Sequence, residues 1–547
     1  MFRGVTVVAI CALAAGAAAC ESELVDPTIP LLEKHMNVPD PSPDTSNKYS
    51  AMPEAAALGK KFYFDTDFSG PEVYADMLLR PMTTPGRATT GQPIKVSCNT
   101  CHDVTKGGGD PTGDPPGNRV SFGAGAYDVN SQQTINSAYN KIIYWNGRND
   151  SLWAQIVAVT ESHVSTNGSR LRVAWRIADA YRAEYSALFP ADPIPAALDS
   201  ITAHKARLEP DGTCTLVAGV CPTDYCQTLN GPCVPRFPLE GRPSFVRSGE
   251  LSTCDPSHND PLLQPNNDAY DCMRLEDQQA VTRMYVNWAK AIAAYEYTLI
   301  SRDSAFDKWA AKGFPVAGLG ASAERGARLF VGKAACAECH SGPLFQDNLF
   351  HATGMPQTGT YIPQTSMCPA GDPWCDCVSD DTNQSLNCLA WGWRDGLRKL
   401  QANKFRRDGV WSDDTECQRH FSVHTDANYA ADHPDECDGR IAYYSQERTD
   451  DLKGQWRTPG LRDVALTAPY MHTGQYKTLR EVIEHYNKGG IVDAMGGEIL
   501  GTIDSKIKVL NLTDVEMDDL VAFLGTLTST LDPAITDPPS VPPDTAF

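Results

Sequence analysis

The sequence predicts a mainly α protein of two units, each interrupted by a cysteine-rich, disulfide-stapled loop insertion. Apolar residues recur at helical spacing in many segments, whereas the sustained apolar–polar alternation that indicates strands is scarce. The pattern Cys-x-x-Cys-His occurs twice, and helical patterns surround both copies. Twelve further cysteines fall into two clusters of six, in stretches whose polar and Pro-bearing composition is typical of loops.

Length and charge narrow the class of protein. The chain has 547 residues, 41% of them hydrophobic, which is enough apolar material for two ordinary domains and their insertions. Its formal net charge is −21. This acidic balance argues against nucleic acid or an anionic membrane as a partner and favours small molecules or basic proteins.

Residues 1–20 are predicted to be a signal peptide. Arg3 precedes an apolar run, residues 5–19, that is too short to span a bilayer comfortably, and small residues offer a cleavage site before Cys20. The protein is therefore expected to be exported, in a bacterium to the periplasm. Cys20 is a candidate for a lipid anchor, although Ala17 stands where Leu is usual.

The first unit is predicted to span residues 51–317, after a Pro- and Ser-bearing tether at residues 21–50. Its helices are expected in the segments PEAAALGKKFYF, SLWAQIVAV, RLRVAWRIADAYRAEYSALF and DQQAVTRMYVNWAKAIAAYEYTLIS. Residues 206–275 form the first cysteine-rich insertion.

The second unit is predicted to span residues 318–530, with the second insertion at residues 354–440. Helices are expected in TLREVIEHYN and TDVEMDDLVAFLGTLTS, each of which begins with a Thr-x-x-Glu capping box. The remaining residues, 531–547, are rich in Pro and are predicted to be a mobile tail.

Both cysteine clusters are predicted to pair internally, because even numbers of cysteines in an exported chain indicate disulfide bonds. A zinc cluster is the alternative, but neither cluster contains paired Cys-x-x-Cys knuckles. The members are Cys214, Cys221, Cys226, Cys233, Cys254 and Cys272 in the first cluster, and Cys368, Cys375, Cys377, Cys388, Cys417 and Cys437 in the second.

The two Cys-x-x-Cys-His segments indicate covalent haem. Cysteines three positions apart on a helical turn lie on one face, so both sulfurs reach the two vinyl groups of one haem and the next His can bind its iron. A redox dithiol or half of a zinc site is the alternative. Two haems c would be held by Cys98, Cys101 and His102, and by Cys336, Cys339 and His340.

Segments around both motifs resemble the bacterial di-haem cytochrome c peroxidases and their MauG-type relatives. These segments are NSQQTINSAYNKIIYWNGRNDSLWAQ (130–155), WRTPGLRDVALTAPYMHTGQYKTLREVIEHYNKGG (456–490), ALGKKFYFDTDFSG and YEYTLISRDSAFDKW. The resemblance implies two cytochrome c-like haem domains, of which the N-terminal one is peroxidatic and the C-terminal one transfers electrons. It also implies that His102 and His340 are the proximal iron ligands. Trp145 matches the tryptophan that carries electrons between the haems; a plain core aromatic is the alternative.

The resemblance further implies one calcium ion between the domains. The side chain of Asn130 and the backbone carbonyls of Thr467 and Pro469 match its ligands, and hard oxygen donors suit this ion. In the same signature, Arg462 and His472 would either brace the haem propionates or serve the structure.

The pocket of the first haem departs from the family. Asn118 stands where peroxidases that need reductive activation have a distal His, so the first iron is expected to be open. Gln155 matches a pocket glutamine, but Ser165 replaces the acid–base glutamate, which a hydroxyl serves poorly. Glu161 and His163 are the nearby candidates for moving the proton, with a bystander role as the alternative for each.

The second haem departs as well, because Tyr486 stands where the peroxidases place a Met ligand. Tyr486 shares a helix face with Leu479 and Ile483, whereas His485 points elsewhere. A Tyr ligand at this place is typical of MauG-type enzymes, so the resemblance implies that Tyr486 binds the second iron. A buried core tyrosine is the alternative.

The sequence thus predicts a periplasmic oxidoreductase that reduces hydrogen peroxide with electrons from a small cytochrome c or another donor protein. Three alternatives stay open. The first is MauG-like, peroxide-dependent oxidation of an aromatic side chain of a partner protein. The second is a non-catalytic di-haem electron carrier. The third is a binding protein whose haems are structural and whose insertions dominate.

Overall fold

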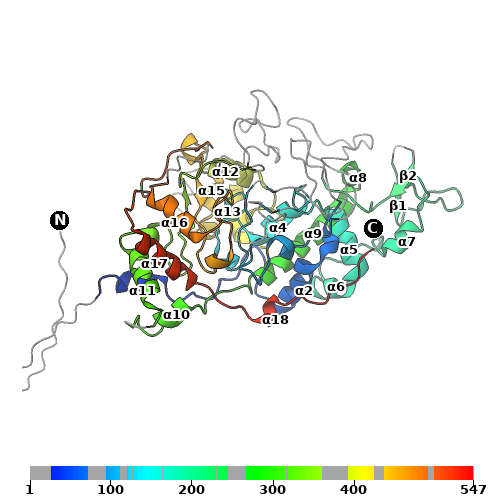
Figure 1. The fold of residues 1–547 in the computed structure, drawn as a ribbon. Helices are drawn as coiled ribbons and strands as arrows, with labels where there is room; N and C mark the ends of the chain where they lie inside the picture. Colours follow the sequence, from blue (N-terminus) through cyan, green and yellow to red (C-terminus); the bar gives the residue numbers. More distant parts are fainter. Residues whose placement is uncertain are drawn as a thin grey trace, which may run out of the picture.

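The computed structural model describes most of residues 26–547 and confirms the mainly α fold class (Figure 1). Outside the described residues lie 1–25, 72–93, 111–119, 122, 125–126, 128, 163, 230, 244–266, 316–317, 360–361, 363–391, 424–435, 491–497 and 546. Among the described residues, no helix combines the length and the apolar character that crossing a membrane requires.

The helices fall before and after the second Cys-x-x-Cys-His segment. Those before it are α1 (Ile29–Leu32), α2 (Pro53–Phe64), α3 (Cys98–Cys101), α4 (Leu152–Thr160), α5 (Arg170–Ala180), α6 (Arg182–Leu188), α7 (Ile201–Lys205), α8 (Asn267–Asp271), α9 (Leu275–Glu296), α10 (Ala305–Ala310) and α11 (Ala321–Val331). Those after it are α12 (Trp393–Ala402), α13 (Thr415–Val423), α15 (Ile441–Tyr444), α16 (Leu479–Asn487), α17 (Asp514–Gly525) and α18 (Pro533–Thr536).

The strands in the described part of the chain form two short antiparallel pairs. Strand β1 (Cys226–Thr228) pairs with β2 (Cys233–Pro235) inside the first insertion. Strand β3 (Phe350–His351) pairs with β4 (Trp456–Arg457), so that Phe350 faces Arg457 and His351 faces Trp456. The second pair joins the chain just after the second haem motif to the start of the 456–490 segment.

The first unit is built around α9, which is buried among α2, α4 and α5. Helix α2 can cross α9 closely because Gly59 has no side chain: a Cβ at this position would lie 1.8 Å from the backbone oxygen of Ala291. This crossing holds α2 beside α3, which carries the first Cys-x-x-Cys-His segment.

The second unit repeats this arrangement with α11 and α17. These two helices and α10 and α16 supply most of its apolar core. Gly326 of α11 meets the backbone of α17, where a Cβ would lie 1.9 Å from the oxygen of Asp519. In each unit, the helix before a haem motif therefore crosses a later helix at a glycine.

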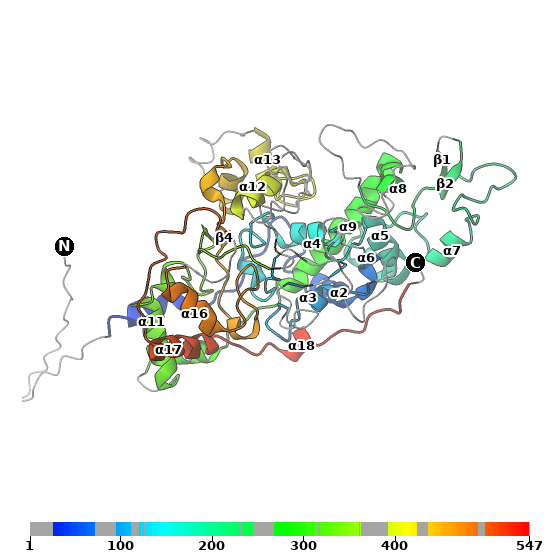
Figure 2. The ribbon, with the colours of Figure 1, turned by 45° about the horizontal axis from the view of Figure 1, so that its top comes forward.

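The second insertion and the residues just after it form a small core, in which α12 and α15 pack on Ile142 of the first unit. Helix α12 lies against the loop after Trp145, since a Cβ on Gly396 would fall 1.4 Å from the oxygen of Asn146. Arg407 reaches the segment before the first unit, where its guanidinium binds Asp44 at 2.6 Å. Figure 2 shows α12 and α13 gathered on one side of the molecule.

The N-terminal segment of the described chain contacts the second unit, and the C-terminal tail contacts the first unit. In the segment predicted to be a tether, Leu32 is buried in the core of the second unit. The tail after α18 runs along the first unit toward its far end (Figure 2). There Arg176 donates to the backbone oxygen of Pro543 at 2.8 Å, and the backbone N–H of Thr545 donates to Asp67 at 2.6 Å. We call α18 and the tail after it, residues 533–547, the C-terminal strap.

The cysteine clusters pair internally wherever the structure describes both partners. The bonds are Cys214–Cys226, Cys221–Cys233 and Cys417–Cys437. Cys272 is also disulfide-bonded. The remaining members, Cys254, Cys368, Cys375, Cys377 and Cys388, lie outside the described residues.

Candidate haem-binding site

Two cavities contain the two Cys-x-x-Cys-His segments. The first cavity, of about 140 Å³, is lined by Cys98, Cys101 and His102 among others. The second cavity, of about 240 Å³, is lined by Cys336, Cys339 and His340 among others. Each segment therefore faces a space of its own.

The first histidine is oriented by the backbone that follows α3. The Nδ1 of His102 donates to the carbonyl of Gly108 at 3.3 Å, which leaves Nε2 as the nitrogen that can bind a metal. Tyr63 of α2 donates to the carbonyl of His102 at 2.7 Å and so ties this turn to the unit's core. Burial lowers the pKa of His102, which keeps the imidazole neutral, as an iron ligand must be.

The second histidine repeats this geometry. Cys336 begins a 3₁₀ turn, Cys336–Glu338, and the Nδ1 of His340 donates to the carbonyl of Phe345 at 2.9 Å. His35, from the N-terminal segment, contacts the carbonyl of His340 through Nε2 at 3.1 Å. Burial lowers the pKa of His340 too.

The residues present fit covalent haem. Cys98, Cys101, Cys336 and Cys339 form no disulfide bonds among the described residues, although other cysteines of the chain are paired. Each pair of thiols lines the same cavity as a neutral imidazole with a fixed Nδ1. Two thiols and one imidazole per cavity are the donor set of a c-type haem.

The two cavities share one wall, and Trp145 is part of it. The indole N–H of Trp145 donates to the carbonyl of Asn130 at 2.8 Å. His472 lies beside this indole, with ring centres 6.4 Å apart, and stacks on Trp456 at 3.9 Å. Residues lining both cavities include Asn130, Ser131, Gln132, Gln133, Asn140, Trp145 and Arg457. A side chain placed between the cavities can relay electrons, but that role of Trp145 stays a prediction.

The residues predicted to hold calcium meet at the same wall. Asn130, Thr467 and Pro469 all line the second cavity, and the side-chain amide of Asn130 lies 2.5 Å from the carbonyl oxygen of Pro469. In this structure the amide nitrogen faces that carbonyl. An ion would bind the amide oxygen instead, so the amide would have to turn over. Calcium therefore stays a prediction.

The candidates for moving a proton in the first cavity separate into two groups. Gln155 and Ser165 line the cavity, and the Ser165 hydroxyl is buried with no hydrogen-bond partner among the described residues. Glu161 does not line it. Arg170 donates to both of its oxygens at 2.8 Å each, so the carboxylate is already paired. His163 and Asn118 lie outside the described residues.

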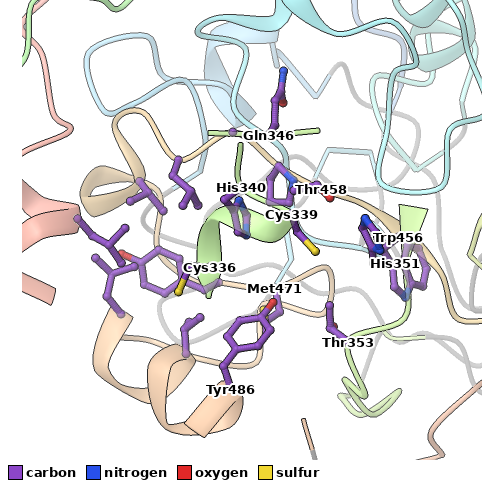
Figure 3. A pocket seen from close by; sticks show the side chains of 18 of the residues that line it. Cys336, Cys339, His340, Gln346, His351, Thr353, Trp456, Thr458, Met471 and Tyr486 are labelled. Carbon is purple, nitrogen blue, oxygen red and sulfur yellow. The ribbon is translucent and has the colours of Figure 1, made fainter. Parts of the chain in front are cut away.

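Tyr486 projects from α16 into the second cavity, and Figure 3 shows it across the pocket from the turn that carries Cys336 and His340. The neighbouring His485 lies elsewhere, with its ring nitrogens on the carbonyl of Thr353 at 2.9 Å and the hydroxyl of Tyr476 at 3.1 Å. Burial raises the pKa of Tyr486. Its phenol therefore keeps its proton at neutral pH unless a cation such as ferric iron binds the oxygen.

Three ionisable residues of the cavity walls were not predicted from the sequence. One is Arg457, in the same signature as Arg462. Arg462 is occupied by Asp307, whose oxygens lie 2.8 and 2.9 Å from its two terminal nitrogens, whereas Arg457 lines both cavities. Nothing in the signature distinguishes the two arginines, because the difference depends on Asp307 folding against one of them.

The second is Glu296, which lines the first cavity near Cys98 and is only 3% exposed. Burial raises its pKa to about 8. It forms no ion pair in the described part of the chain. A charged residue within the apolar run AIAAYEYTLI was the signal that could have found it.

The third is His351, which lines the second cavity (Figure 3). Its Nε2 lies 2.9 Å from Asp347 and its Nδ1 lies 2.6 Å from Asp504. These carboxylates and the adjacent Cys339 raise the pKa of His351 to about 10, so it is a cation at neutral pH.

Two cavities that each pair a Cys-x-x-Cys-His segment with a neutral imidazole are the arrangement expected of a protein that binds two haems c. Comparisons with known proteins agree. Residues 53–209 match the family model of di-haem cytochrome c peroxidase. The cytochrome-c peroxidase IdrP1 of Denitromonas iodatirespirans is 33% identical over 256 residues, 46% of this chain and 52% of that protein, so this chain spans about half the length of that relative.

Two further relatives extend the comparison. The cytochrome-c peroxidase IdrP1 of Pseudomonas sp. (strain SCT) is 24% identical over 539 residues, 98% of this chain and 94% of that protein. The methylamine utilization protein MauG of Methylorubrum extorquens is 28% identical over 252 residues, 46% of either chain. The predicted resemblance to di-haem cytochrome c peroxidases and MauG-type proteins is thereby confirmed.

Proposed function

We propose that the chain is a periplasmic di-haem peroxidase that reduces hydrogen peroxide to water with electrons from a small cytochrome c or another donor protein. The observation that carries the proposal is the pair of cavities with Cys-x-x-Cys-His segments that share Trp145 in their common wall. The reaction consumes one peroxide, two electrons and two protons and releases two waters. Haem iron supplies the redox chemistry when it is bound.

The division of labour follows the two units. Residues 51–317 form the peroxidatic unit and residues 318–530 the electron-transfer unit, with His102 and His340 as proximal ligands. Electrons enter at the second haem and cross the shared wall through Trp145. A signal peptide at residues 1–20 directs export, and Cys20 is the candidate for a lipid anchor.

Polar side chains of the first cavity handle the substrate. The amide of Gln155 and the hydroxyl of Ser165 can hold peroxide or a water by hydrogen bonds, since both line the cavity and the hydroxyl has no other partner among the described residues. Glu161 is bound by Arg170 and cannot accept a proton without breaking that pair. Among the predicted acids and bases, His163 therefore remains the candidate for the proton.

A second candidate function is peroxide-dependent oxidation of an aromatic side chain of a partner protein, as the resemblance to MauG-type proteins suggested. The observation that favours it is Tyr486, which lines the second cavity in place of a Met. A phenolate ligand stabilises oxidised iron and suits a haem that stores an oxidising equivalent.

The test is spectroscopic and kinetic. Protein matured with the haem-attachment machinery should carry two haems by intact mass and stain for haem on a denaturing gel. Cys98→Ala and Cys336→Ala should each impair one attachment. Peroxide should change the spectrum, and reduced cytochrome c should then be oxidised at two molecules per peroxide.

Three outcomes would contradict the proposed peroxidase function. Fewer than two haems would remove its basis. A spectrum that stays silent to peroxide in every redox state would indicate an electron carrier or a binding protein with structural haems. Peroxide consumption without cytochrome oxidation, together with cross-linked or hydroxylated aromatic residues in a partner protein, would favour the second candidate.

A further inference from the structure

The wall between the two cavities contains a buried positive charge that lacks a counter-ion. Arg457 lines both cavities and is 4% exposed. No carboxylate lies within ion-pair distance of its guanidinium among the described residues; the charge of Asp347 acts on it from further away, and Asp347 is bound by His351. Its hydrogen-bond acceptors are all neutral: Asn140 at 3.2 Å, Gln346 at 3.3 Å and the backbone oxygen of Thr458 at 3.3 Å.

This charge cannot move away from the wall. Arg457 belongs to β4, which pairs with β3, and its backbone N–H donates to the carbonyl of Trp145 at 2.8 Å. Burial lowers the pKa of Arg457 only to about 10, so the side chain is a cation at neutral pH. A buried, unpaired cation is costly, which indicates that the folded holoprotein supplies an anion here.

The geometry also shows which edge of the guanidinium needs a partner. All three neutral acceptors bind the same terminal nitrogen, Nη1. The Nε of Arg457 is buried without any partner, and so is the side-chain nitrogen of Gln132, which also lines both cavities. Two unsatisfied donors from different segments therefore meet the shared wall. Nε and Nη2 together form the planar fork that binds one carboxylate in a bidentate manner.

We propose that Arg457, assisted by Gln132, binds a propionate carboxylate of haem at the wall between the two cavities and thereby sets the reduction potentials of both haems. The proposal rests on the two haem sites of the proposed function. Haem is the ligand that brings carboxylates into these cavities. Because Arg457 borders both, its charge acts on both irons, whereas Arg462 is already neutralised by Asp307.

The expected effect has a definite sign. A positive charge near a haem favours the state with one more electron, so it raises the reduction potential. Arg457→Gln should lower the midpoint potentials of both haems, and Arg457→Lys should restore them in part because it keeps the charge without the fork. In Arg457→Gln the propionate also loses the partner that keeps it ionised, so the potentials should become more dependent on pH near neutrality.

The experiment is a spectroelectrochemical titration of the holoprotein and its variants at several pH values. Arg398→Gln is the matched control, because Arg398 is also 4% exposed but pairs with Asp395 in α12 and lines neither cavity. Lowered potentials of both haems in Arg457→Gln, with Arg398→Gln unchanged, would support the proposal. Potentials within error of the wild type in Arg457→Gln would overturn it.

The haem content of the protein distinguishes a failure of this proposal from a failure of the proposed function. Protein with fewer than two haems defeats the haem sites themselves, whereas two haems with unmoved potentials defeat only the role of Arg457. If Arg457→Gln does not mature, resonance Raman spectra of the wild type decide. Propionate bending modes at the frequencies of a hydrogen-bonded carboxylate would support binding of a propionate by Arg457. Modes at the frequencies of free propionates would overturn it.

Discussion

Glu296 illustrates how one side chain can make stability depend on pH. Burial raises its pKa to about 8, from an ordinary value near 4.5. Between these values the folded protein holds a proton on this carboxyl that the unfolded chain releases. Stability should therefore fall as pH rises from about 4.5 to about 8, by up to roughly 1.4 kcal/mol per pH unit from this group.

Glu296→Gln should remove this slope, because an amide does not titrate. Thermal unfolding of the holoprotein between pH 5 and about pH 8 measures it. Glu54→Gln, at an exposed position at the start of α2, is the control and should leave the slope as it is. A slope that survives in Glu296→Gln would show that another group binds the proton.

Whether Tyr486 binds the second iron can be measured, and the answer bears on the choice between the two candidate functions. If its oxygen binds the second iron, Tyr486→Met should raise the potential of that haem, because a thioether favours ferrous iron and a phenolate favours ferric iron. A redox titration followed by the visible spectrum measures the change. Tyr476→Phe is the control, since Tyr476 contacts His485 and does not line the cavity. Equal potentials in wild type and Tyr486→Met would leave Tyr486 as a core tyrosine.

Side chains differ in how far the sequence predicts them. The orientation of Tyr486 into the cavity follows from helical spacing, which is a local property. The pairing of Glu161 with Arg170 does not, because it depends on how α5 begins relative to the end of α4. The same holds for Arg457 and Arg462, which only tertiary contacts distinguish.

Among the elements, the two helix crossings at glycine depend on the absence of a side chain. A Cβ at Gly59 would lie 1.8 Å from a backbone oxygen of α9, and backbone cannot rotate away as a side chain can. Gly59→Ala should destabilise the protein by about 1–3 kcal/mol through this overpacking. Chemical denaturation measures the loss. Gly525→Ala is the control, because a Cβ at Gly525 meets nothing within 4 Å. Equal losses for both variants would refute the crossing as the cause.

The helices were the best predicted elements, because periodicity and capping are local. Thr478 and Thr513 cap α16 and α17 as the Thr-x-x-Glu pattern predicts. The segment RLRVAWRIADAYRAEYSALF instead forms two helices that meet at Tyr181. The contacts of residues 26–50 and of the C-terminal strap were not predicted. Their composition indicates little regular structure, but it carries no information about which carbonyls distant arginines will bind.

At the scale of the whole molecule, calcium is expected to couple the two units. Asn130 belongs to the first unit and Pro469 to the second, and their side-chain amide and carbonyl oxygen already lie 2.5 Å apart. Metal analysis of the holoprotein should find one calcium, and its removal by a chelator should slow electron transfer between the haems. Asn130→Ala should show the same defect without a chelator. Absence of calcium, or rates unaffected by the chelator, would contradict the site.

The C-terminal strap has a consequence for the order of maturation. Residues 533–547 are synthesised after the residues of the first unit that they contact. Until then, Arg176 lacks the backbone oxygen of Pro543, and Asp67, which pairs with Lys95 just before Cys98, lacks the backbone N–H of Thr545. The strap can therefore close on the first unit only after the chain around the first Cys-x-x-Cys-His segment has been made.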